Sequence, residues 1–273
     1  GFGHGHSRKT NTGGDHSKHG IWWEQLPEAL SVVDRDELDL VGLHMHIGSG
    51  VDYDHLAQVA DAMRDTVLRA GRDVQAISAG GGLTVPYRPG EPELDGARYF
   101  AAWDAARREI VDRLGHPVRL EIEPGRFLVA EAGVLAAEVR AVKDQGRNRF
   151  VLVDAGFNDL LRPALYGAHH EITVLRPDGT PRAGDRQETS VAGPLCESGD
   201  VFTQDGNGEL APVALPPAQV GDLLVFRDAG AYGAAMSSNY NSRPLAPEVL
   251  VDGDATRLIR RRQTIDDLLA LEV

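Results

Sequence analysis

The chain has 273 residues, of which 42% are hydrophobic, and its formal net charge is −13. This length predicts one or two domains, and the apolar content is enough for a buried core, which argues against a disordered chain. The acidic balance argues against nucleic-acid binding, and no apolar run reaches the ~18 residues of a membrane span. The single cysteine excludes a disulfide framework. We therefore expect a cytoplasmic globular protein that binds neither nucleic acid nor membrane.

The first part of the chain alternates between predicted helices and strands. Residues 1–20 are rich in Gly, His and polar side chains and predict a loop. Apolar residues at helical spacing around Leu30, with Pro27 in the first turn, predict a helix. The run 38–48 then predicts a strand that ends in a glycine turn.

Two longer amphipathic helices follow. We expect Asp54 to open the first and Gly71 to close it, and Asp95 to open the second and Gly115 to close it. Their predicted buried faces consist of apolar residues three or four positions apart: Leu56, Val59, Ala60, Met63 and Val67 in the first, and Tyr99, Trp103, Ala106 and Ile110 in the second.

Short strands precede and follow the second of these helices, at 74–78 and 119–123. Residues 38–126 therefore alternate strand and helix, which predicts a parallel sheet. Chemistry in such sheets lies at the carboxyl ends of the strands, where the glycine and polar loops of this chain fall. Three parallel strands cannot close a barrel of eight, so we expect that the N-terminal part of a barrel precedes Gly1.

The pattern changes near residue 130, where short apolar runs are divided by Gly, Pro and Asp. These runs predict an antiparallel β domain, followed by a short helix with a capping box between Thr264 and Asp267. The expected domains are therefore 1–130, a partial (β/α) barrel, and 131–273, a β domain with a short terminal helix.

Three loops of the first domain carry candidate chemistry. HIGSG (46–50) and SAGGG (78–82) follow strands and precede helices, an arrangement that suits phosphate binding but also serves plain βα turns. EPGR (123–126) places a carboxylate at a strand end and an arginine three residues later. These side chains either form a surface salt bridge or face a ring nitrogen and a phosphate or carboxylate.

The second domain offers three further motifs. Cys196 lies in CESGD, a loop setting that favours an acid/base or substrate-contact role over that of an inert core cysteine. Tyr232 lies in a glycine-rich turn, which is either ordinary structure or a means of presenting the ring. Arg162 and Tyr166 are four residues apart, and they either share a helix face or divide between surface and core.

Two histidines raise a rival hypothesis. His44 and His46 alternate on one predicted strand, and an HxH pair can ligate zinc in a metal-dependent hydrolase. This reading leaves the glycine loops, EPGR and CESGD without roles, and no matching set of carboxylates accompanies the pair. We therefore expect no metal.

Long motifs spread over the whole chain resemble one family, the diaminopimelate decarboxylases. These are pyridoxal-phosphate enzymes of the alanine racemase-like barrel fold, fold type III. The resemblance implies an α/β plus β fold, the C-terminal part of a TIM-type barrel followed by an antiparallel β domain. It also implies decarboxylation of meso-2,6-diaminopimelate to L-lysine and CO₂, the last step of lysine biosynthesis. The motifs are GHGHSRKTNTGGDHSKHGI, LHMHIGSGVDY, ISAGGGL, LEIEPGRFLV, VLVDAGFNDLLRPALYG, VAGPLCESGDVF and GAYGAAMSSNYNSRP.

The resemblance further implies roles for individual residues. His46 would stack on the cofactor ring, Glu123 would pair with the pyridine nitrogen, and Cys196 would donate a proton. Together with His46 and Glu123, the implied pyridoxal-phosphate contacts are Ser49, Gly81, Gly82, Gly125, Arg126 and Tyr232. The implied substrate contacts are Arg126, Arg162, Tyr166, Glu197 and Tyr232. Cys196 and Glu197 would reach a neighbouring subunit's site, which implies a homodimer with shared active sites.

One departure concerns the lysine that forms a Schiff base with the cofactor in this family. The chain has three lysines, Lys9, Lys18 and Lys143, and none lies in a matching context. We expect that lysine upstream of Gly1, and that the 273 residues alone fold poorly and turn over no substrate. Two alternatives remain: an ornithine- or arginine-type decarboxylase of the same fold, and a non-catalytic fragment that dimerises with a full-length relative.

Overall fold

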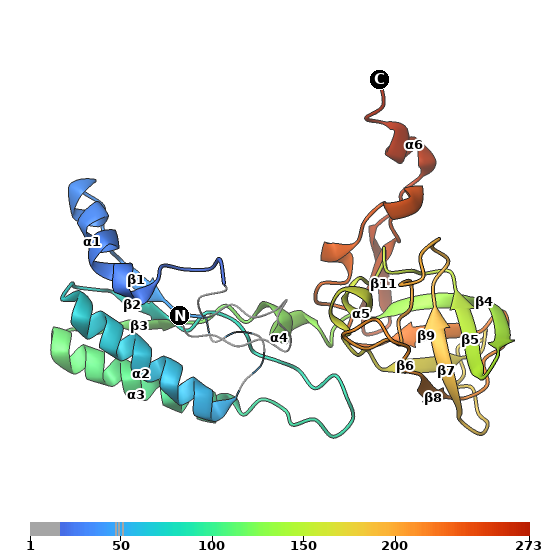
Figure 1. The fold of residues 1–273 in the computed structure, drawn as a ribbon, viewed down its shortest axis with the longest axis horizontal. Coiled ribbons are helices and arrows are strands. Elements are labelled where there is room, and N and C mark those ends of the chain that lie inside the picture. Colours follow the sequence, from blue (N-terminus) through green and yellow to red (C-terminus); the bar gives the residue numbers. More distant parts are fainter. Residues whose placement is uncertain (1–16, 47, 49, 51) are drawn as a thin grey trace. The chain divides into compact units, whose positions relative to one another are not determined.

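The computed structural model describes residues 17–46, 48, 50 and 52–273. The chain divides into two compact units, which are described separately. Unit 1 comprises Gly1–Pro86 and Gly90–Leu128, and unit 2 comprises Tyr87–Pro89 and Val129–Val273 (Figure 1). Tyr87–Pro89 thus belongs to unit 2, although it lies between two segments of unit 1 in the sequence.

Unit 1 contains the predicted parallel sheet. Strands β1 (Gly42–His44), β2 (Ala76–Ser78) and β3 (Arg119–Glu121) lie in that order, and both pairings are parallel. Each strand is shorter than the run that predicted it: β1 is shorter at both ends, β2 begins two residues later and β3 ends two residues earlier. All three carboxyl ends lie at one edge of the sheet.

The helices of unit 1 are η2 (Trp23–Gln25), α1 (Leu26–Arg35), α2 (Tyr53–Ala70), α3 (Gly96–Leu114) and α4 (Gly125–Val129). Figure 1 shows α2 and α3 side by side along one face of the sheet. The predicted apolar faces of α2 and α3 are buried in full, and Met63 and Trp103 have no exposed surface. This burial is the main stabilising contribution in unit 1, at about 1.5–3 kcal/mol for each large apolar side chain.

The helix ends follow the sequence signals with one correction. Asp95 caps α3 through the Arg98 N–H, and Gly115 closes it with a positive φ, as predicted. The cap of α2 is Asp52 rather than Asp54, because the Asp52 carboxylate accepts from the Asp54 N–H at 3.0 Å. Asp54 is therefore inside the first turn, where an acidic side chain also favours the helix dipole.

Unit 2 is built on a six-stranded sheet with the order β6-β9-β4-β5-β7-β8. The expected antiparallel pairing is confirmed for four of the five pairs of adjacent strands, whereas β5 and β7 run parallel. The parallel pair arises because the chain leaves the sheet after β5 and adds β6 at the far side before returning as β7. The strands are β4 (Leu135–Gln145), β5 (Asn148–Val153), β6 (Ile172–Leu175), β7 (Gln187–Ala192), β8 (Val213–Leu215) and β9 (Leu223–Phe226).

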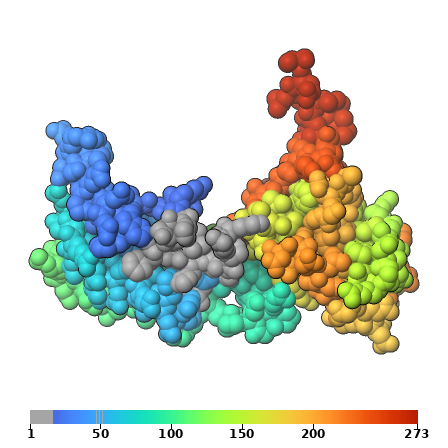
Figure 2. All heavy atoms as spheres, in the orientation of Figure 1, coloured from blue at the N-terminus to red at the C-terminus, as the bar shows by residue number. Residues whose placement is uncertain are grey.

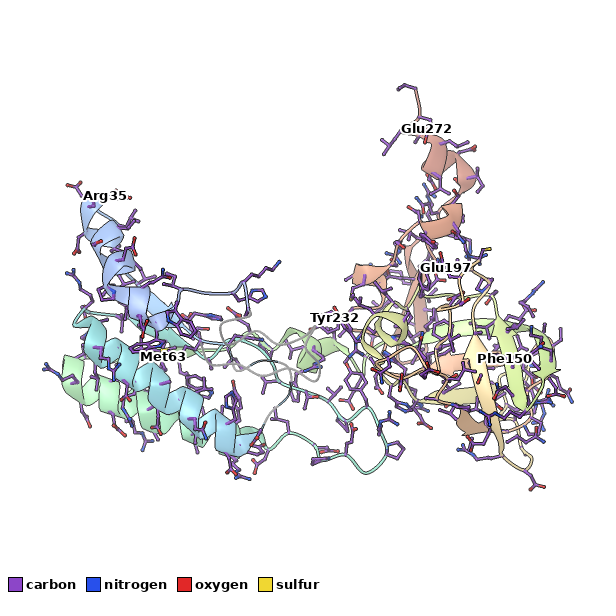
Figure 3. The ribbon with its side chains drawn as sticks, in the orientation of Figure 1. Arg35, Met63, Phe150, Glu197, Tyr232 and Glu272 are labelled. Carbon is purple, nitrogen blue, oxygen red and sulfur yellow. The ribbon has the colours of Figure 1, made fainter. Side chains whose placement is uncertain are left out.

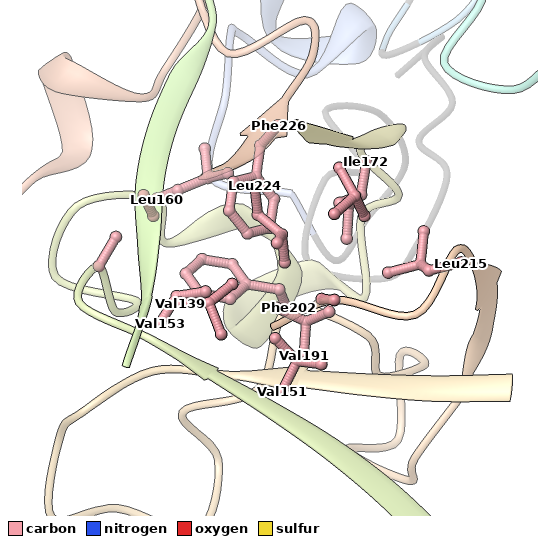
Figure 4. Close-up of a cluster of buried hydrophobic side chains, with 14 of the residues drawn as sticks. Val139, Val151, Val153, Leu160, Ile172, Val191, Phe202, Leu215, Leu224 and Phe226 are labelled. Carbon is pink, nitrogen blue, oxygen red and sulfur yellow. The ribbon is translucent and has the colours of Figure 1, made fainter. Parts of the chain in front are cut away.

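The core of unit 2 is a separate apolar cluster drawn from all these strands (Figure 4). Phe202 and Phe226 contact each other at its centre, with ring centroids 4.5 Å apart. Leu160 and Leu224 are fully buried beside them. This core fixes the loops between the strands, and those loops carry the motifs identified in the second half of the sequence.

The chain ends in a hairpin of β10 (Glu248–Asp252) and β11 (Ala255–Arg260), followed by α6 (Ile265–Leu269). The predicted capping box is confirmed, since Thr264 accepts from the Asp267 N–H and Asp267 accepts from the Thr264 N–H. Figure 2 shows the red end of the chain, which contains α6, standing out from the rest of unit 2. Among the described residues, no helix is both long and apolar enough to cross a membrane.

Candidate functional site

The three strand ends of unit 1 come together as a hydrogen-bonded cluster. The Met45 N–H donates to the Ser78 carbonyl at 3.0 Å, and the Glu123 N–H donates to the Gly80 carbonyl at 2.8 Å. The Gly81 N–H donates to Nδ1 of His46 at 3.0 Å. Residues from the three predicted loops therefore form one site, which we call the strand-end cluster: His44, His46, Gly80, Gly81 and Glu123.

His46 is held as a neutral imidazole. Its Nδ1 accepts the hydrogen bond from Gly81, so the ring proton lies on Nε2. Burial lowers the pKa of His46 below its usual value, and the neighbouring His44 lowers it further. A neutral, flat ring with a fixed orientation is suited to stacking against a ligand ring.

The glycines of the cluster are required by close backbone approach. Gly80 has φ +64°, and a Cβ on it would lie 2.9 Å from Nε2 of His44 and from the Met45 carbonyl. A Cβ on Gly81 would lie 2.7 Å from the Glu123 carbonyl. The glycines therefore serve the close packing of the three strand ends, and the Gly81 N–H is engaged with His46.

The acidic residue of EPGR is solvent-accessible and has one side-chain partner in the described residues. Oε2 of Glu123 lies 3.3 Å from Nε2 of His44. Arg126, in α4, is buried, and its Nε donates to the Leu83 carbonyl at 3.4 Å. Of the two alternatives for EPGR, a salt bridge between Glu123 and Arg126 is not formed, so the two charged side chains have different partners. Ser49 lies outside the described residues.

In unit 2, the side chain of Arg162 is held in place by several neighbouring residues. It opens α5 (Arg162–Tyr166), where Pro163 occupies the first turn, and it is buried. Its guanidinium lies 4.7 Å from the ring centroid of Tyr87 and 5.6 Å from that of Tyr232. Nη1 of Arg162 lies 3.1 Å from Nε2 of His170. Tyr166 is half-buried in the same short helix.

Tyr232 owes its position to a strained turn. Its φ is +67°, a value that L side chains rarely adopt. The flanking Gly230 is pinned by its N–H, which donates to the Ala130 carbonyl at 3.0 Å, and a Cβ there would collide with the Val129 carbonyl. Strain of this kind persists where the surroundings enforce it and is common at functional sites.

Cys196 and Glu197 lie in an exposed loop of unit 2. The Tyr240 hydroxyl donates a hydrogen bond to Oε1 of Glu197, and this bond raises the pKa of Tyr240. The Tyr240 ring also contacts Phe157, with ring centroids 5.4 Å apart. Figure 3 labels Glu197 and Tyr232, which come from two different loops of unit 2.

A buried carboxylate organises that loop from beneath. Asp200 accepts from the Phe157 N–H at 2.7 Å and from the Leu195 N–H at 2.8 Å. Burial raises the pKa of Asp200, while these two hydrogen bonds oppose the shift. A Cβ on Gly193 would collide with the same carboxylate. Asp200 thus ties the loop of Cys196 and Glu197 to the loop that leads into α5.

Four supporting residues were not predicted from the sequence: Tyr87, His170, Asp200 and Tyr240. Two of them lie inside motifs that had been identified, since Asp200 ends CESGD and Tyr240 lies in SSNYNSRP. A buried polar residue next to a candidate catalytic residue was the available signal. His170 and Tyr87 had no such signal, because their contacts join distant segments.

The metal-hydrolase hypothesis gains no support from these contacts. No group of three or more His, Cys, Asp or Glu side chains in the described part of the chain is arranged to hold a metal. His44 contacts Glu123, and Nδ1 of His46 is occupied by the Gly81 N–H. Both histidines therefore act within the strand-end cluster.

Comparisons with known proteins agree with this geometry. Residues 30–230 match the sequence model described as pyridoxal-dependent decarboxylase, C-terminal sheet domain. The whole chain is 71% identical to 62% of a diaminopimelate decarboxylase from Streptomyces coelicolor. The chain spans less than two thirds of the length of this relative and of two further curated diaminopimelate decarboxylases that it matches.

Solved structures give the same result. A crystal structure of diaminopimelate decarboxylase matches the whole chain with a TM-score of 0.96 at 63% identity, over 65% of that chain. A diaminopimelate decarboxylase from Helicobacter pylori, complexed with L-lysine, matches 97% of this chain and 63% of that one, with a TM-score of 0.79 at 34% identity. The expected fold, part of a barrel followed by a β domain, is therefore confirmed.

Proposed function

The chain belongs to the pyridoxal-dependent decarboxylase family, and from this premise we propose that it forms the C-terminal part of a diaminopimelate decarboxylase. The reaction would convert meso-2,6-diaminopimelate to L-lysine and CO₂. Support comes from the identity of 71% to a curated diaminopimelate decarboxylase over the full chain. It also comes from Arg162 and Glu197 in unit 2, whose side chains are held by hydrogen bonds to His170 and Tyr240.

The strand-end cluster fits pyridoxal phosphate. Gly80 and Gly81 let the three strand ends pack closely together, which brings His46 and Glu123 to the same edge of the sheet. His46 offers a neutral ring for stacking, and Glu123 offers an exposed carboxylate. We propose that these residues hold the cofactor ring, with Gly82, Gly125 and Arg126 as phosphate contacts, and the family resemblance adds Tyr232 as a further cofactor contact.

When bound, pyridoxal phosphate would supply an electron sink for the pair of electrons left on the substrate carbon after CO₂ departs. The negative charge of Glu123 would keep a pyridine nitrogen protonated by charge pairing. His44, 3.3 Å away, would orient that carboxylate. His46 would fix the ring plane and exclude water from one face.

Most of the proposed substrate contacts belong to unit 2. Arg162 presents a planar fork that matches a carboxylate, and Glu197 presents a negative charge that matches an ammonium group. Tyr166 and Arg126 would add further contacts to the substrate. We propose that Cys196 returns a proton from Sγ to the carbon that has lost CO₂, after which the thiolate regains a proton from solvent.

The observation that carries the choice of substrate is the enclosure of Arg162. Diaminopimelate has a second amino-acid end, whereas ornithine lacks a second carboxylate. The Arg162 guanidinium is buried beside the rings of Tyr87 and Tyr232, and a planar cationic fork of this kind matches a carboxylate. Arg162 therefore favours a substrate with a distal carboxylate over the ornithine- or arginine-type alternative.

A substrate panel tests this proposal. The protein that carries this chain, supplied with pyridoxal phosphate, should release CO₂ from meso-diaminopimelate, and much more slowly from ornithine, arginine and lysine. Arg162→Lys should raise KM for diaminopimelate and leave any ornithine turnover unchanged, because only the former has a distal carboxylate. Equal turnover of ornithine and diaminopimelate would refute the substrate assignment.

We further propose that Cys196 and Glu197 act in the site of a second copy of the chain. Their exposed loop supports this, as does the resemblance to a family with shared sites. Co-expression of Glu197→Gln and Glu123→Gln proteins provides the test. A shared site predicts that mixed dimers regain activity, because one of their two sites is then intact. If co-expression does not restore activity, the shared site is refuted, and each active site is formed by a single chain.

The alternative of a non-catalytic fragment predicts something else. The 273 residues alone would then bind a full-length relative and form a stable complex without turnover. Measurable CO₂ release from the chain alone would refute both this alternative and the expectation that the Schiff-base lysine lies upstream.

A further inference from the structure

His170 has no part in the chemistry proposed above, yet it is one of the most enclosed polar residues of unit 2. It is 5% exposed and lies beyond the end of α5. Its ring joins two distant segments, since Nε2 lies 3.1 Å from Nη1 of Arg162 and Nδ1 lies 2.8 Å from the Arg227 carbonyl.

The two partners fix the position of the ring proton. A carbonyl oxygen can only accept a hydrogen bond and a guanidinium can only donate one. Nδ1 of His170 must therefore carry the proton that goes to Arg227, and Nε2 must accept from Arg162. Burial lowers the pKa of His170 to about 4, so the ring is neutral near pH 7 and retains this acceptor.

The same histidine also supports the aromatic wall beside Arg162. The rings of His170 and Tyr87 meet edge to face, with centroids 5.7 Å apart. Tyr87 in turn lies against the Arg162 guanidinium. His170 thus limits the movement of Arg162 in two ways. It contacts Nη1 of Arg162 directly, and it supports the Tyr87 ring against which the Arg162 guanidinium lies.

We propose that His170 is a positioning residue that orients the Arg162 guanidinium for a carboxylate of the substrate. This inference rests on the proposed function for the identity of that carboxylate. An arginine fork can bind a carboxylate through two N–H groups while another N–H is engaged elsewhere. His170 itself does not exchange protons with substrate, because both of its ring nitrogens are engaged inside unit 2.

Two substitutions separate positioning from packing. Glutamine can place its side-chain oxygen near the position of Nε2, so His170→Gln keeps an acceptor for Arg162. Asparagine reaches only the position of Nδ1, so His170→Asn keeps a donor for the Arg227 carbonyl and loses the acceptor. Both variants remove the aromatic ring, so the effect of losing the ring contact with Tyr87 should be similar in the two.

We expect His170→Asn to raise KM for meso-diaminopimelate by about tenfold or more, the size of a lost hydrogen bond to a charged group. Its kcat should change little, because the distal carboxylate is bound equally in the ground state and the transition state. His170→Gln should stay within about threefold of the wild type in KM. His116→Gln, in unit 1, serves as a control for the loss of a histidine elsewhere. Equal KM values for the Asn and Gln variants would overturn the proposal.

A second measurement is independent of activity. In protein labelled with ¹⁵N-histidine, His170 should give the signals of a neutral ring with the proton on Nδ1 at pH 7. Its Nε2 signal should shift in Arg162→Lys protein. A charged ring or the opposite tautomer would overturn the positioning role. If the wild type does not decarboxylate diaminopimelate but these signals are present, the proposed function fails and the positioning of Arg162 stands.

Discussion

The two units build their parts of the site by different means. In unit 1 the strand-end cluster is made largely by backbone: parallel strands end together, and glycines allow His46, Gly81 and Glu123 to meet. In unit 2 the important groups are held by side chains from distant loops, with His170 on Arg162 and Tyr240 on Glu197. The first kind of site follows from local sequence patterns, whereas the second depends on the tertiary fold.

The largest effect is expected from adding one carbon to the backbone-built site. Gly81→Ala would place a Cβ 2.7 Å from the Glu123 carbonyl and 3.3 Å from the His46 ring, so these strand ends must separate. A displacement of ~1 Å in a catalytic site can cost about 100-fold in rate. We expect at least that loss in kcat/KM, together with weaker retention of pyridoxal phosphate.

Gly96→Ala is the matched control for this change. A Cβ at Gly96, the first residue of α3, meets no atom within 4 Å. Activity and cofactor retention should be those of the wild type. If Gly81→Ala behaved like Gly96→Ala, the strand-end cluster would not depend on close backbone approach.

A second pair of glycines applies the same probe to unit 2. Gly193→Ala would drive a Cβ against the Asp200 carboxylate and to 2.7 Å from the Ala155 carbonyl. We expect a loss of about 2–3 kcal/mol of stability, typical of an overpacked site, and a fall in kcat as the loop of Cys196 moves. Gly199→Ala lies in the same loop, where a Cβ meets no atom within 4 Å.

Urea unfolding and steady-state kinetics on both variants distinguish the outcomes. Gly199→Ala should match the wild type in both measurements. A stable Gly193→Ala protein with normal kcat would mean that Asp200 does not hold the loop in place.

The difference between the two units explains what could be predicted from the sequence. The faces of α2 and α3, the cap at Asp95 and the capping box at Thr264 were predicted correctly, because each depends on residues a few positions apart. The cap at Asp52 was missed by two residues, since two neighbouring aspartates offer nearly the same local signal. The residues expected at the strand ends do meet, because parallel pairing alone brings them together.

The parts that were not predicted all involve long sequence separations. His170 contacts Arg227, and Asp200 contacts Phe157, across 57 and 43 positions respectively. Nothing in either local sequence specifies its partner. The parallel pairing of β5 and β7 has the same cause, because it depends on where β6 is placed in the sheet.

A pH titration probes the side-chain network of unit 2 directly. The folded-state pKa of His170 is about 4, below the usual value of 6.5, mainly because the ring is buried and also because Arg162 and His169 are near. The unfolded chain therefore takes up a proton that the folded chain does not, and stability falls as the pH drops from 6.5 towards 4. The resulting loss of stability is about 2 kcal/mol at pH 5 and about 3 kcal/mol at pH 4.

Urea unfolding of wild type and His170→Gln at pH 7 and pH 5 isolates this contribution. The stability advantage of the wild type should shrink by about 2 kcal/mol between the two values. His116 gives the opposite sign, because its hydrogen bond to Asp73 raises the pKa of His116. The hydrogen bond of His116 therefore stabilises the folded wild type more at pH 5 than at pH 7, and His116→Gln should lack this gain in stability. An advantage of wild type over His170→Gln that does not change with pH would show that His170 is not buried as a neutral ring.

The smallest expected effect is at Tyr240, and it tests how far the exposed Glu197 depends on a single tether. Tyr240→Phe removes the hydroxyl that donates to Glu197 and keeps the ring contact with Phe157. If Glu197 binds the distal ammonium of the substrate, KM should rise by about tenfold or less, with kcat nearly unchanged. Tyr53→Phe, which removes a hydroxyl bonded to the Asp95 backbone in unit 1, should leave KM unchanged. A KM for Tyr240→Phe equal to that of Tyr53→Phe would mean that Glu197 finds its position without the tyrosine, because an exposed carboxylate can then be oriented by the substrate alone.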